Sequence, residues 1–163
     1  MKSTGLNRDT IDKFYTKPSI SKKCCEYFKQ IIQINPEIDI IIEPSAGNGS
    51  FIPQILEMSY NCLFYDIEPE AELIVKQDYL NLDINSLDIP DLHTKIHTIG
   101  NPPFGRQSSL AIKFIKKSAE ISDTIAFILP KSFKKDSMKK HFPNNFHLIY
   151  QFDLEDNSFM INQ

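Results

Sequence analysis

Long hydrophobic runs and cysteine motifs are both missing from this sequence of 163 residues. No apolar run approaches the roughly 20 residues that span a bilayer, and the lysine-containing N-terminus has no signal-peptide core. We therefore expect an intracellular protein without a membrane segment. The three cysteines, Cys24, Cys25 and Cys62, form no CxxC or Cys/His motif, so reduced and mostly buried thiols are favoured over a disulfide or a zinc site.

A histidine pattern typical of a metal site or a catalytic triad is also missing. We expect no metal and interpret the four histidines as structural or surface residues: His93, His97, His141 and His147. The composition is 41% hydrophobic and 24% charged, which is typical of a globular protein rather than a disordered one. The length predicts a single domain over residues 1–163 with a sizeable core.

Charge is unevenly distributed along the chain, although the net charge is only −3. Residues 1–36 carry +4, residues 37–130 carry −8 and residues 131–163 carry +1. Because phosphate binding needs only a local basic patch, these values leave a nucleic-acid partner open. Phosphate contact is one interpretation of the C-terminal lysines, and a solvated surface is the other: Lys131, Lys134, Lys135, Lys139 and Lys140.

Strand-like apolar runs alternate with amphipathic helical segments, which predicts an α/β fold with a doubly wound, mostly parallel sheet. Six strands are expected, at residues 38–43, 61–68, 73–78, 95–101, 123–130 and 146–154. Three helices are expected, at residues 19–34, 49–58 and 108–121. Ser19 or Ser21 is the expected N-cap of the first helix, and Pro53 is tolerated only in the first turn of the second.

Small residues and acids follow the first three expected strands. Gly47 and Gly49 permit close backbone approach by a ligand beyond the carboxyl end of a strand, where doubly wound sheets bind ligands. Asp66 ends the second strand, where an acid can accept from both hydroxyls of a ribose. Asp78 ends the third strand and is placed to accept from an adenine amino group.

The glycine loop also distinguishes between two adenosine-containing ligands. NAD fits a glycine loop with a ribose acid, but the third glycine of GxGxxG is replaced by Ile52. Glu43 precedes the loop, where a carboxylate would crowd a pyrophosphate. That acid suits a ligand with an ammonium group and no phosphate, a description that S-adenosylmethionine fits.

Two consecutive prolines follow the fourth expected strand. Pro102 and Pro103 fix their own φ and donate no backbone hydrogen bond, and Asn101 before them is held extended. The Asn101 side-chain oxygen and the Pro102 carbonyl are therefore available as acceptors on a stiff backbone. Such a loop is well suited to aiming two acceptors at one ligand.

Five segments, in this order, resemble the motifs of S-adenosylmethionine-dependent adenine-N6 methyltransferases. They are "EPSAGNGSF" (43–51), "YDIEPE" (65–70), "QDYL" (77–80), "NPPFG" (101–105) and "FILPKSF" (127–133). The class in which the cofactor motif precedes the catalytic motif is the most similar. "KFYTKP" (13–18) resembles the additional N-terminal motif of that class, in which a Thr/Pro segment contacts the methionine end of the cofactor.

The resemblance implies a Rossmann-like fold of the class I methyltransferase type and an N6-adenine methyltransferase acting on DNA or RNA. The implied contacts of S-adenosylmethionine are Thr16, Pro18, Glu43, Pro44, Ser45, Ala46, Gly47, Gly49, Phe51, Asp66, Ile67, Asp78, Tyr79 and Asn101. The implied catalytic residues are Asn101, Pro102, Pro103 and Phe104. Asn101 and Pro102 would each accept one N–H of the target amino group, and Phe104 would stack on an adenine that is single-stranded or flipped out.

The sequence also departs from that family. Members end their sheet with an antiparallel seventh strand, whereas this sequence stops at "DNSFMINQ" (156–163). We therefore expect a sheet with an open edge, which lowers stability or is covered by a protein partner or a second copy. The N-terminal segment 1–36 is expected to be helical and to carry the cofactor-contacting motif, and there is no room for a separate target-recognition domain.

Other functions remain open on the sequence alone. Methylation of guanine N2 in ribosomal RNA and of glutamine N5 in a protein also use NPP-aromatic motifs, although "EPSAG" and "FYTKP" favour adenine. A non-catalytic scaffold with a methyltransferase fold is the alternative from another class, and intact cofactor and catalytic positions argue against it. An NAD-dependent oxidoreductase is disfavoured because NPPF has no role in hydride transfer.

Overall fold

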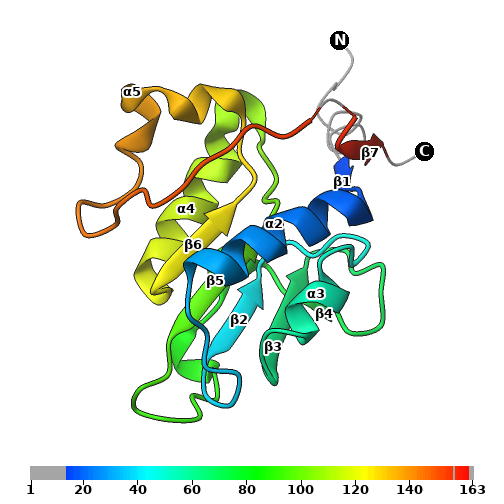
Figure 1. Cartoon of the computed structure of the whole chain (residues 1–163), viewed down its shortest axis with the longest axis vertical. Coiled ribbons are helices and arrows are strands. Elements are labelled where there is room, and N and C mark those ends of the chain that lie inside the picture. Colours follow the sequence, from blue (N-terminus) through cyan, green and yellow to red (C-terminus); the bar gives the residue numbers. More distant parts are fainter. Residues whose placement is uncertain (1–13, 156, 162–163) are drawn as a thin grey trace.

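A five-stranded parallel sheet forms the centre of the molecule (Figure 1). The computed structural model describes residues 14–155 and 157–161. The strands of the chain are β1 (Phe14–Thr16), β2 (Ile40–Glu43), β3 (Asn61–Asp66), β4 (Val75–Lys76), β5 (Ile96–Gly100), β6 (Thr124–Phe127) and β7 (Phe159–Ile161). The α-helices are α2 (Pro18–Ile31), α3 (Ile52–Leu56), α4 (Ser109–Ile121) and α5 (Asp136–Lys139). Short 3₁₀ turns are η1 (Tyr79–Asn81), η2 (Ile84–Ser86), η3 (Arg106–Ser108) and η4 (Lys131–Lys134).

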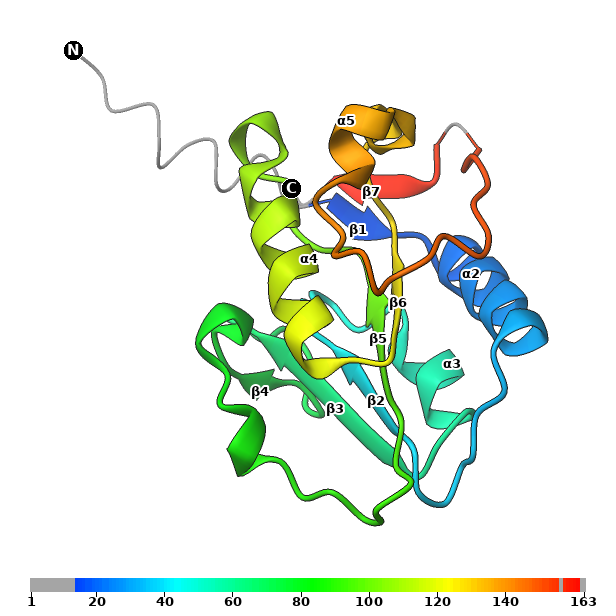
Figure 2. The same cartoon turned by 90° about the vertical axis from the view of Figure 1, so that its left-hand side faces the viewer.

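The order of the strands is β4-β3-β2-β5-β6, and every neighbouring pair is parallel. Helices α2 and α3 cover one face of this sheet, and α4 covers the other (Figure 2). The predicted α/β fold with a doubly wound parallel sheet is therefore confirmed at the level of a Rossmann-like arrangement. This arrangement collects the loops that follow β2, β3, β5 and β6 at one edge, because parallel strands share a carboxyl end.

Alternate residues of β2 pack into two separate cores. Ile41 faces α2 and α3, where it packs with Phe28 and Ile55. Ile40 and Ile42 face the opposite side, in a cluster that includes Phe114 of α4. All four β2 residues are buried, as expected for a central strand covered on both faces.

Several boundaries differ from the sequence expectations. The first helix begins one residue earlier than expected, with Pro18 in its first turn, and its N-cap is Lys17 rather than Ser19 or Ser21. Ser21 is buried instead, and its hydroxyl donates to the carbonyl groups of Pro18 and Ser50. Proline is favoured at the first helical position because its missing N–H needs no partner there. The expected strand at 73–78 is only the two residues of β4.

The expected sixth strand at 146–154 is wrong, because this segment forms no regular structure. It lies against α2, where the rings of Tyr150 and Phe152 pack on Tyr27, with centroids 5.6 and 4.7 Å away. Asp153 also forms an ion pair with Lys134. These side-chain contacts hold the segment along α2 in place of a strand pairing with β6.

A strand that the sequence did not predict follows that segment. β7 pairs antiparallel with β1, so that Thr16 lies opposite Phe159. The pairing continues as the backbone N–H of Lys17 donates to the carbonyl of Ser158 at 3.0 Å. β6 remains an edge of the main sheet, which contains no antiparallel strand among the residues described. No helix in the described ranges is long and apolar enough to cross a membrane.

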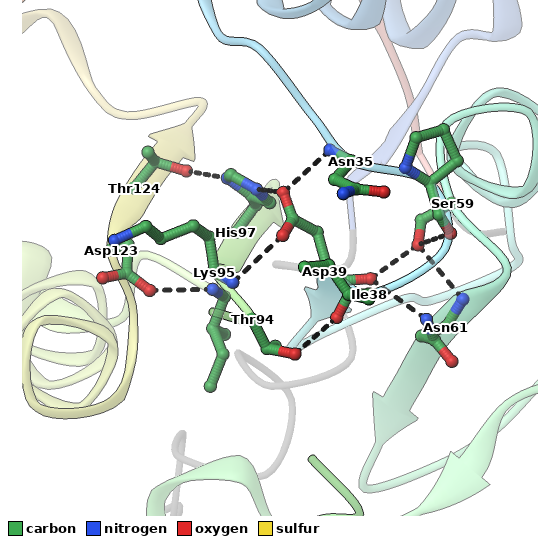
Figure 3. Close-up of polar contacts among 12 residues, drawn as sticks. Asn35, Ile38, Asp39, Ser59, Asn61, Thr94, Lys95, His97, Asp123 and Thr124 are labelled. Carbon is green, nitrogen blue, oxygen red and sulfur yellow. Dashed lines mark hydrogen bonds and ion pairs between the residues drawn. The ribbon is translucent and has the colours of Figure 1, made fainter. Parts of the chain in front are cut away.

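A buried polar network braces the amino ends of β2, β5 and β6 (Figure 3). Asp39 and His97 are 3% and 2% exposed, and the Asp39 carboxylate lies 2.9 Å from Nε2 of His97. Nδ1 of His97 contacts the Thr124 hydroxyl at 2.7 Å, and Asp39 also accepts from the backbone amides of Asn35 and Lys95. The side chains of Asp39, His97 and Thr124 are all hydrogen-bonded, which explains how these polar groups are tolerated in the core. His97 is thus structural, as the sequence predicted.

Candidate functional site

A small hollow lies at the carboxyl edge of the sheet, where β1 crosses the loops that follow β2 and β5. Its lining residues are Tyr15, Thr16, Glu43, Ser45, Ala46, Gly47, Asn48, Ser50, Phe51 and Asn101. Seven of them were predicted from the sequence as site residues, and the structure brings those seven together. The cavity volume is about 30 Å³, which is room for about two water molecules. An ammonium group is similar in size to a water molecule and therefore fits in the hollow. Any larger ligand must extend out of the hollow.

Glu43 is the most unusual residue of this hollow. It ends the buried strand β2, is 1% exposed, and its Oε2 has no hydrogen-bond partner among the described residues. Burial, and then the negative charge of Asp66, raise the pKa of Glu43 well above its ordinary value. An unpartnered buried carboxyl costs free energy unless a ligand satisfies it. A cation with N–H donors is the ligand chemistry that would do so.

Asp66 braces the glycine loop. Its Oδ2 accepts from the backbone N–H of Gly47 at 2.8 Å, and its Oδ1 accepts from the N–H of Glu68 at 2.8 Å. Gly47 adopts a φ of 58°, a left-handed conformation that favours glycine. Each carboxylate oxygen can accept a second hydrogen bond, so Asp66 can still accept from a ligand hydroxyl while it holds the loop.

The strand β1 packs over the loop that contains Gly47. The ring of Tyr15 lies over Gly47, where a methyl group in place of the glycine hydrogen would contact it at 3.5 Å. The Tyr15 hydroxyl donates to Glu70 at 2.7 Å, which links β1 to the loop after β3. Burial and the neighbouring carboxylates of Glu70, Asp66 and Glu68 raise the pKa of Tyr15 to about 12, so the phenol remains a donor. No local sequence pattern predicts this hydrogen bond, because its partners lie 55 residues apart in the chain.

Asn101 occupies the position after β5 that the sequence predicted. Its Nδ2 donates to the Thr16 hydroxyl at 3.2 Å, and its backbone carbonyl accepts from the Ser45 hydroxyl at 3.1 Å. Both neighbours come from other predicted motifs. No described residue donates to Oδ1 of Asn101 or to the Pro102 carbonyl. The two acceptors expected from the sequence are therefore unengaged, one on Asn101, which lines the hollow, and one on the adjoining Pro102.

The rest of the NPPF segment is held by α4. Pro102 is buried and Pro103 is exposed. The carbonyl of Phe104 accepts from the backbone amides of Leu110 and Ala111 in the first turn of α4. The half-buried Phe104 ring packs against an apolar cluster of α4 and η4 residues. These contacts anchor the loop at both ends.

Four other predicted residues have distinct placements. Ile67 follows Asp66 and is 62% exposed, as an apolar wall for a planar ligand would be. Asp78 caps η1 by accepting from Leu80 N–H and from Asn81. Tyr79 is buried on the opposite face of the sheet, stacked on Phe114, so its side chain does not line the hollow. Pro18 is exposed in the first turn of α2.

The electrostatic environment of the hollow is acidic. Beyond Glu43, three carboxylates act on Tyr15 in the lining: Asp66 at the end of β3, and Glu68 and Glu70 in the loop after it. This concentration of negative charge favours cationic ligands over phosphates. Among the described residues, no group of three histidine, cysteine or acidic side chains has an arrangement that could hold a metal ion.

The hollow offers acceptors that suit a ligand with an ammonium group and nearby hydroxyl groups. Glu43 offers a buried acceptor for an ammonium group, and the backbone at Gly47 leaves space that a side chain would fill against Tyr15. Asp66 retains acceptor capacity for ribose hydroxyls beside the exposed Ile67. Comparison with protein-family models gives no match, and comparison with curated proteins gives no significant similarity.

Proposed function

We propose that this chain is an S-adenosylmethionine-dependent methyltransferase that acts on the exocyclic N6 amino group of adenine in DNA or RNA. The proposal rests on the resemblance of five ordered motifs and on how their residues lie in the hollow. The observation that carries it is the pair of unengaged acceptors, Oδ1 of Asn101 and the Pro102 carbonyl, beside the orphaned Glu43 carboxyl.

An amino group conjugated with an aromatic ring is a poor nucleophile, because its lone pair is delocalised into the ring. Asn101 Oδ1 and the Pro102 carbonyl would each accept one N–H of the amino group. Two acceptors held on a proline-stiffened backbone would favour the orientation in which the lone pair points out of the ring plane. Orientation and local electrostatics would supply most of the rate enhancement.

When bound, S-adenosylmethionine supplies an electrophilic methyl group on a sulfonium centre. The amino nitrogen would accept that methyl group in exchange for one N–H proton, which it would release to water once methylation has made the nitrogen acidic. No strong base is needed, which suits a neutral Asn101. Glu43 and Asp66 would hold the ammonium and the ribose, and the half-exposed ring of Phe104 would stack on the base.

The test is methyl transfer from labelled cofactor to single- and double-stranded DNA and RNA, followed by mass spectrometry of the nucleosides. We expect N6-methyladenine in one of these pools and none with the variant Asn101→Ala. Detection of N2-methylguanine would make guanine N2 the methyl acceptor instead of adenine N6. Label in the glutamine of a protein substrate would make glutamine N5 the acceptor. Thermal stabilisation by the cofactor without any product would favour a scaffold role, since a ligand that binds only the native state must stabilise it.

A further inference from the structure

Basic residues are concentrated in one stretch of the chain. Residues 106–140 contain nine Lys and Arg against three Asp and Glu, a net charge of +6 within a chain whose net charge is −3. The remaining residues therefore carry −9. Such a separation of charge gives the molecule one face that attracts polyanions and another that repels them.

The fold gathers this stretch beside the candidate site. α4 and η4 pack on each other through an apolar cluster of Ala111, Ile115 and Phe133, with Phe104 and Met138 at its border. Figures 1 and 2 show α5 beside the amino-terminal half of α4, at the end of the sheet where β1 lies. We call the basic side chains in and beside η3, α4, η4 and α5 the basic surface: Arg106, Lys116, Lys131, Lys135, Lys139 and Lys140. All of these are exposed except the half-buried Lys139.

The pKa of His141 is affected by two lysines of the basic surface. This residue is half-buried, and burial followed by the charges of Lys116 on α4 and Lys140 after α5 lowers its pKa. Two lysines that are distant in sequence therefore act on one imidazole. Residues 106–140 contain three acids, Glu120, Asp123 and Asp136, and Asp153 of the next segment is paired with Lys134. The basic charges of this surface thus exceed the acidic ones.

The order of the strands places this basic surface next to Asn101. β5, which Asn101 follows, lies between β2 and β6. The loops on the β2 and β3 side carry Glu43 and the four carboxylates of residues 66–72, and the segment on the β6 side carries the lysines. A polyanion at Asn101 would be repelled from the first side and attracted to the second.

We propose that the basic surface binds the sugar–phosphate backbone of a nucleic acid whose target base enters at Asn101. The role of Asn101 rests on the proposed function, but the binding of phosphates does not. An anionic membrane is the less favoured partner, because the exposed Leu148, Ile149 and Tyr150 belong to the segment along α2 and not to α4, η4 or α5. Nucleic-acid backbones need only the lysines and arginine that are present.

The test measures binding of an oligothymidylate of about 20 nucleotides, which contains no adenine and tests backbone contact alone. The variant Lys135→Glu/Lys140→Glu is compared with the control Lys22→Glu/Lys29→Glu, which makes the same charge change at exposed positions of α2. We expect at least a tenfold loss of affinity for the first and little change for the control. The slope of log K against log salt should fall in magnitude by about 1.4, since each lost phosphate contact on a single strand contributes about 0.7.

His141 gives a second readout that does not depend on any substitution. A phosphate bound between Lys116 and Lys140 would offset their charge, so the pKa of His141 should rise when the oligonucleotide is added, as followed by NMR. Equal losses in both double variants, an unchanged pKa of His141, or binding to anionic phosphatidylglycerol vesicles but not to the oligonucleotide would overturn the proposal. Binding without methyl transfer would refute only the proposed enzyme. N6-methyladenine formation with unchanged affinity in the double variant would refute only the basic surface.

Discussion

The amide of Asn101 is oriented by Thr16. Nδ2 of Asn101 donates to the Thr16 hydroxyl at 3.2 Å, and this bond turns Oδ1 away from Thr16 and leaves it without a partner among the described residues. Thr16 is 3% exposed on β1, which is itself held by pairing with β7. A residue near one end of the chain thus positions the amide of a loop 85 residues away.

Replacing the Thr16 hydroxyl should therefore affect turnover. In Thr16→Val the amide of Asn101 loses its partner and can rotate, so we expect kcat to fall by about tenfold to a hundredfold, because small misplacements of a positioning group are costly. Thr16→Ser keeps the hydroxyl and should retain most of the activity. Steady-state kinetics with both substrates would check this. Equal kcat values for the two variants, or an effect only on KM for the cofactor, would contradict the positioning role.

Glu43 should make the stability of the ligand-free protein depend on pH. Because burial and the charge of Asp66 raise its folded-state pKa, the stability contributed by the neutral carboxyl is present below the unfolded pKa and is lost as pH rises through the folded one. We expect the Tm of the wild type to fall over that range and the Tm of Glu43→Gln to be flatter. Thermal unfolding at a series of pH values would measure both.

S-adenosylmethionine should stabilise the wild type more than the Glu43→Gln variant. The ammonium group would pair with the ionised Glu43, so the Tm increase on adding the ligand should grow with pH in the wild type. The neutral glutamine of Glu43→Gln cannot supply that charge, so its Tm increase should be smaller wherever Glu43 is ionised and should not grow with pH. If the ligand raised the Tm of Glu43→Gln as much as that of the wild type, Glu43 would not bind the ligand.

The parallel sheet and the residues after its strands could be predicted from the sequence, because both follow from local patterns. Buried strands such as 40–43 are apolar runs, and the Gly47 and Asn101 loops follow them directly. The segment 146–154 has an equally apolar pattern, but tertiary contacts with Tyr27 and Lys134 decide its conformation. Periodicity cannot reveal such contacts, since each depends on residues more than 15 positions away.

The β1–β7 pairing and the Tyr15–Glu70 bond were missed for a related reason. Both strands of the pair contain only three residues, which is too short for a periodic pattern. Tyr79 shows the converse: the motif that contains it predicted a cofactor contact, whereas its ring is committed to the core against Phe114. The positions of the motifs predicted which backbone segments lie near one another. The direction of each side chain depends on tertiary packing, which the motifs do not predict.

The buried Asp39–His97 pair should be important for stability. Asp39→Ala would leave His97 and two backbone amides without their acceptor, so we expect a loss of about 3 kcal/mol in the free energy of unfolding. Asp88→Ala, which removes an exposed aspartate, is the matched control and should change it by less than about 0.5 kcal/mol. Urea denaturation at neutral pH would measure both variants. Similar values for the two would show that the buried network contributes little.

The same pair predicts sensitivity to acid. Burial alone would raise the pKa of Asp39, but the hydrogen bonds from His97 and from the amides of Asn35 and Lys95 outweigh it and lower the pKa. A depressed folded pKa contributes stability that is present above the unfolded pKa and is lost as pH falls through the folded one. The wild type should therefore lose stability at acidic pH more steeply than Asp39→Ala does. Parallel slopes would assign the acid sensitivity to other carboxyl groups.

The turn that joins the NPPF segment to α4 stores backbone strain that single substitutions can change. Gln107 and Ser108 have φ values of 53° and 62°, in the left-handed region that non-glycine residues rarely adopt. Ser108→Gly should relieve that strain and raise the free energy of unfolding by about 0.5–1 kcal/mol. Gly105→Ala should have the opposite effect, because its φ is 71° and a Cβ there would lie 2.8 Å from Cγ of Leu110 and 3.0 Å from the Leu110 backbone nitrogen.

The two variants also separate the effect of backbone strain on stability from the effect of the position of the NPPF loop on methyl transfer. Gly105→Ala should displace Phe104, whose carbonyl accepts from Leu110 and Ala111, and should reduce methyl transfer as well as stability. Ser108→Gly leaves those hydrogen bonds in place and should change stability while kcat stays within about twofold of the wild type. Chemical denaturation and single-turnover kinetics on the same preparations would compare them. If Gly105→Ala lost stability but kept full turnover, the position of Phe104 would not matter for the reaction.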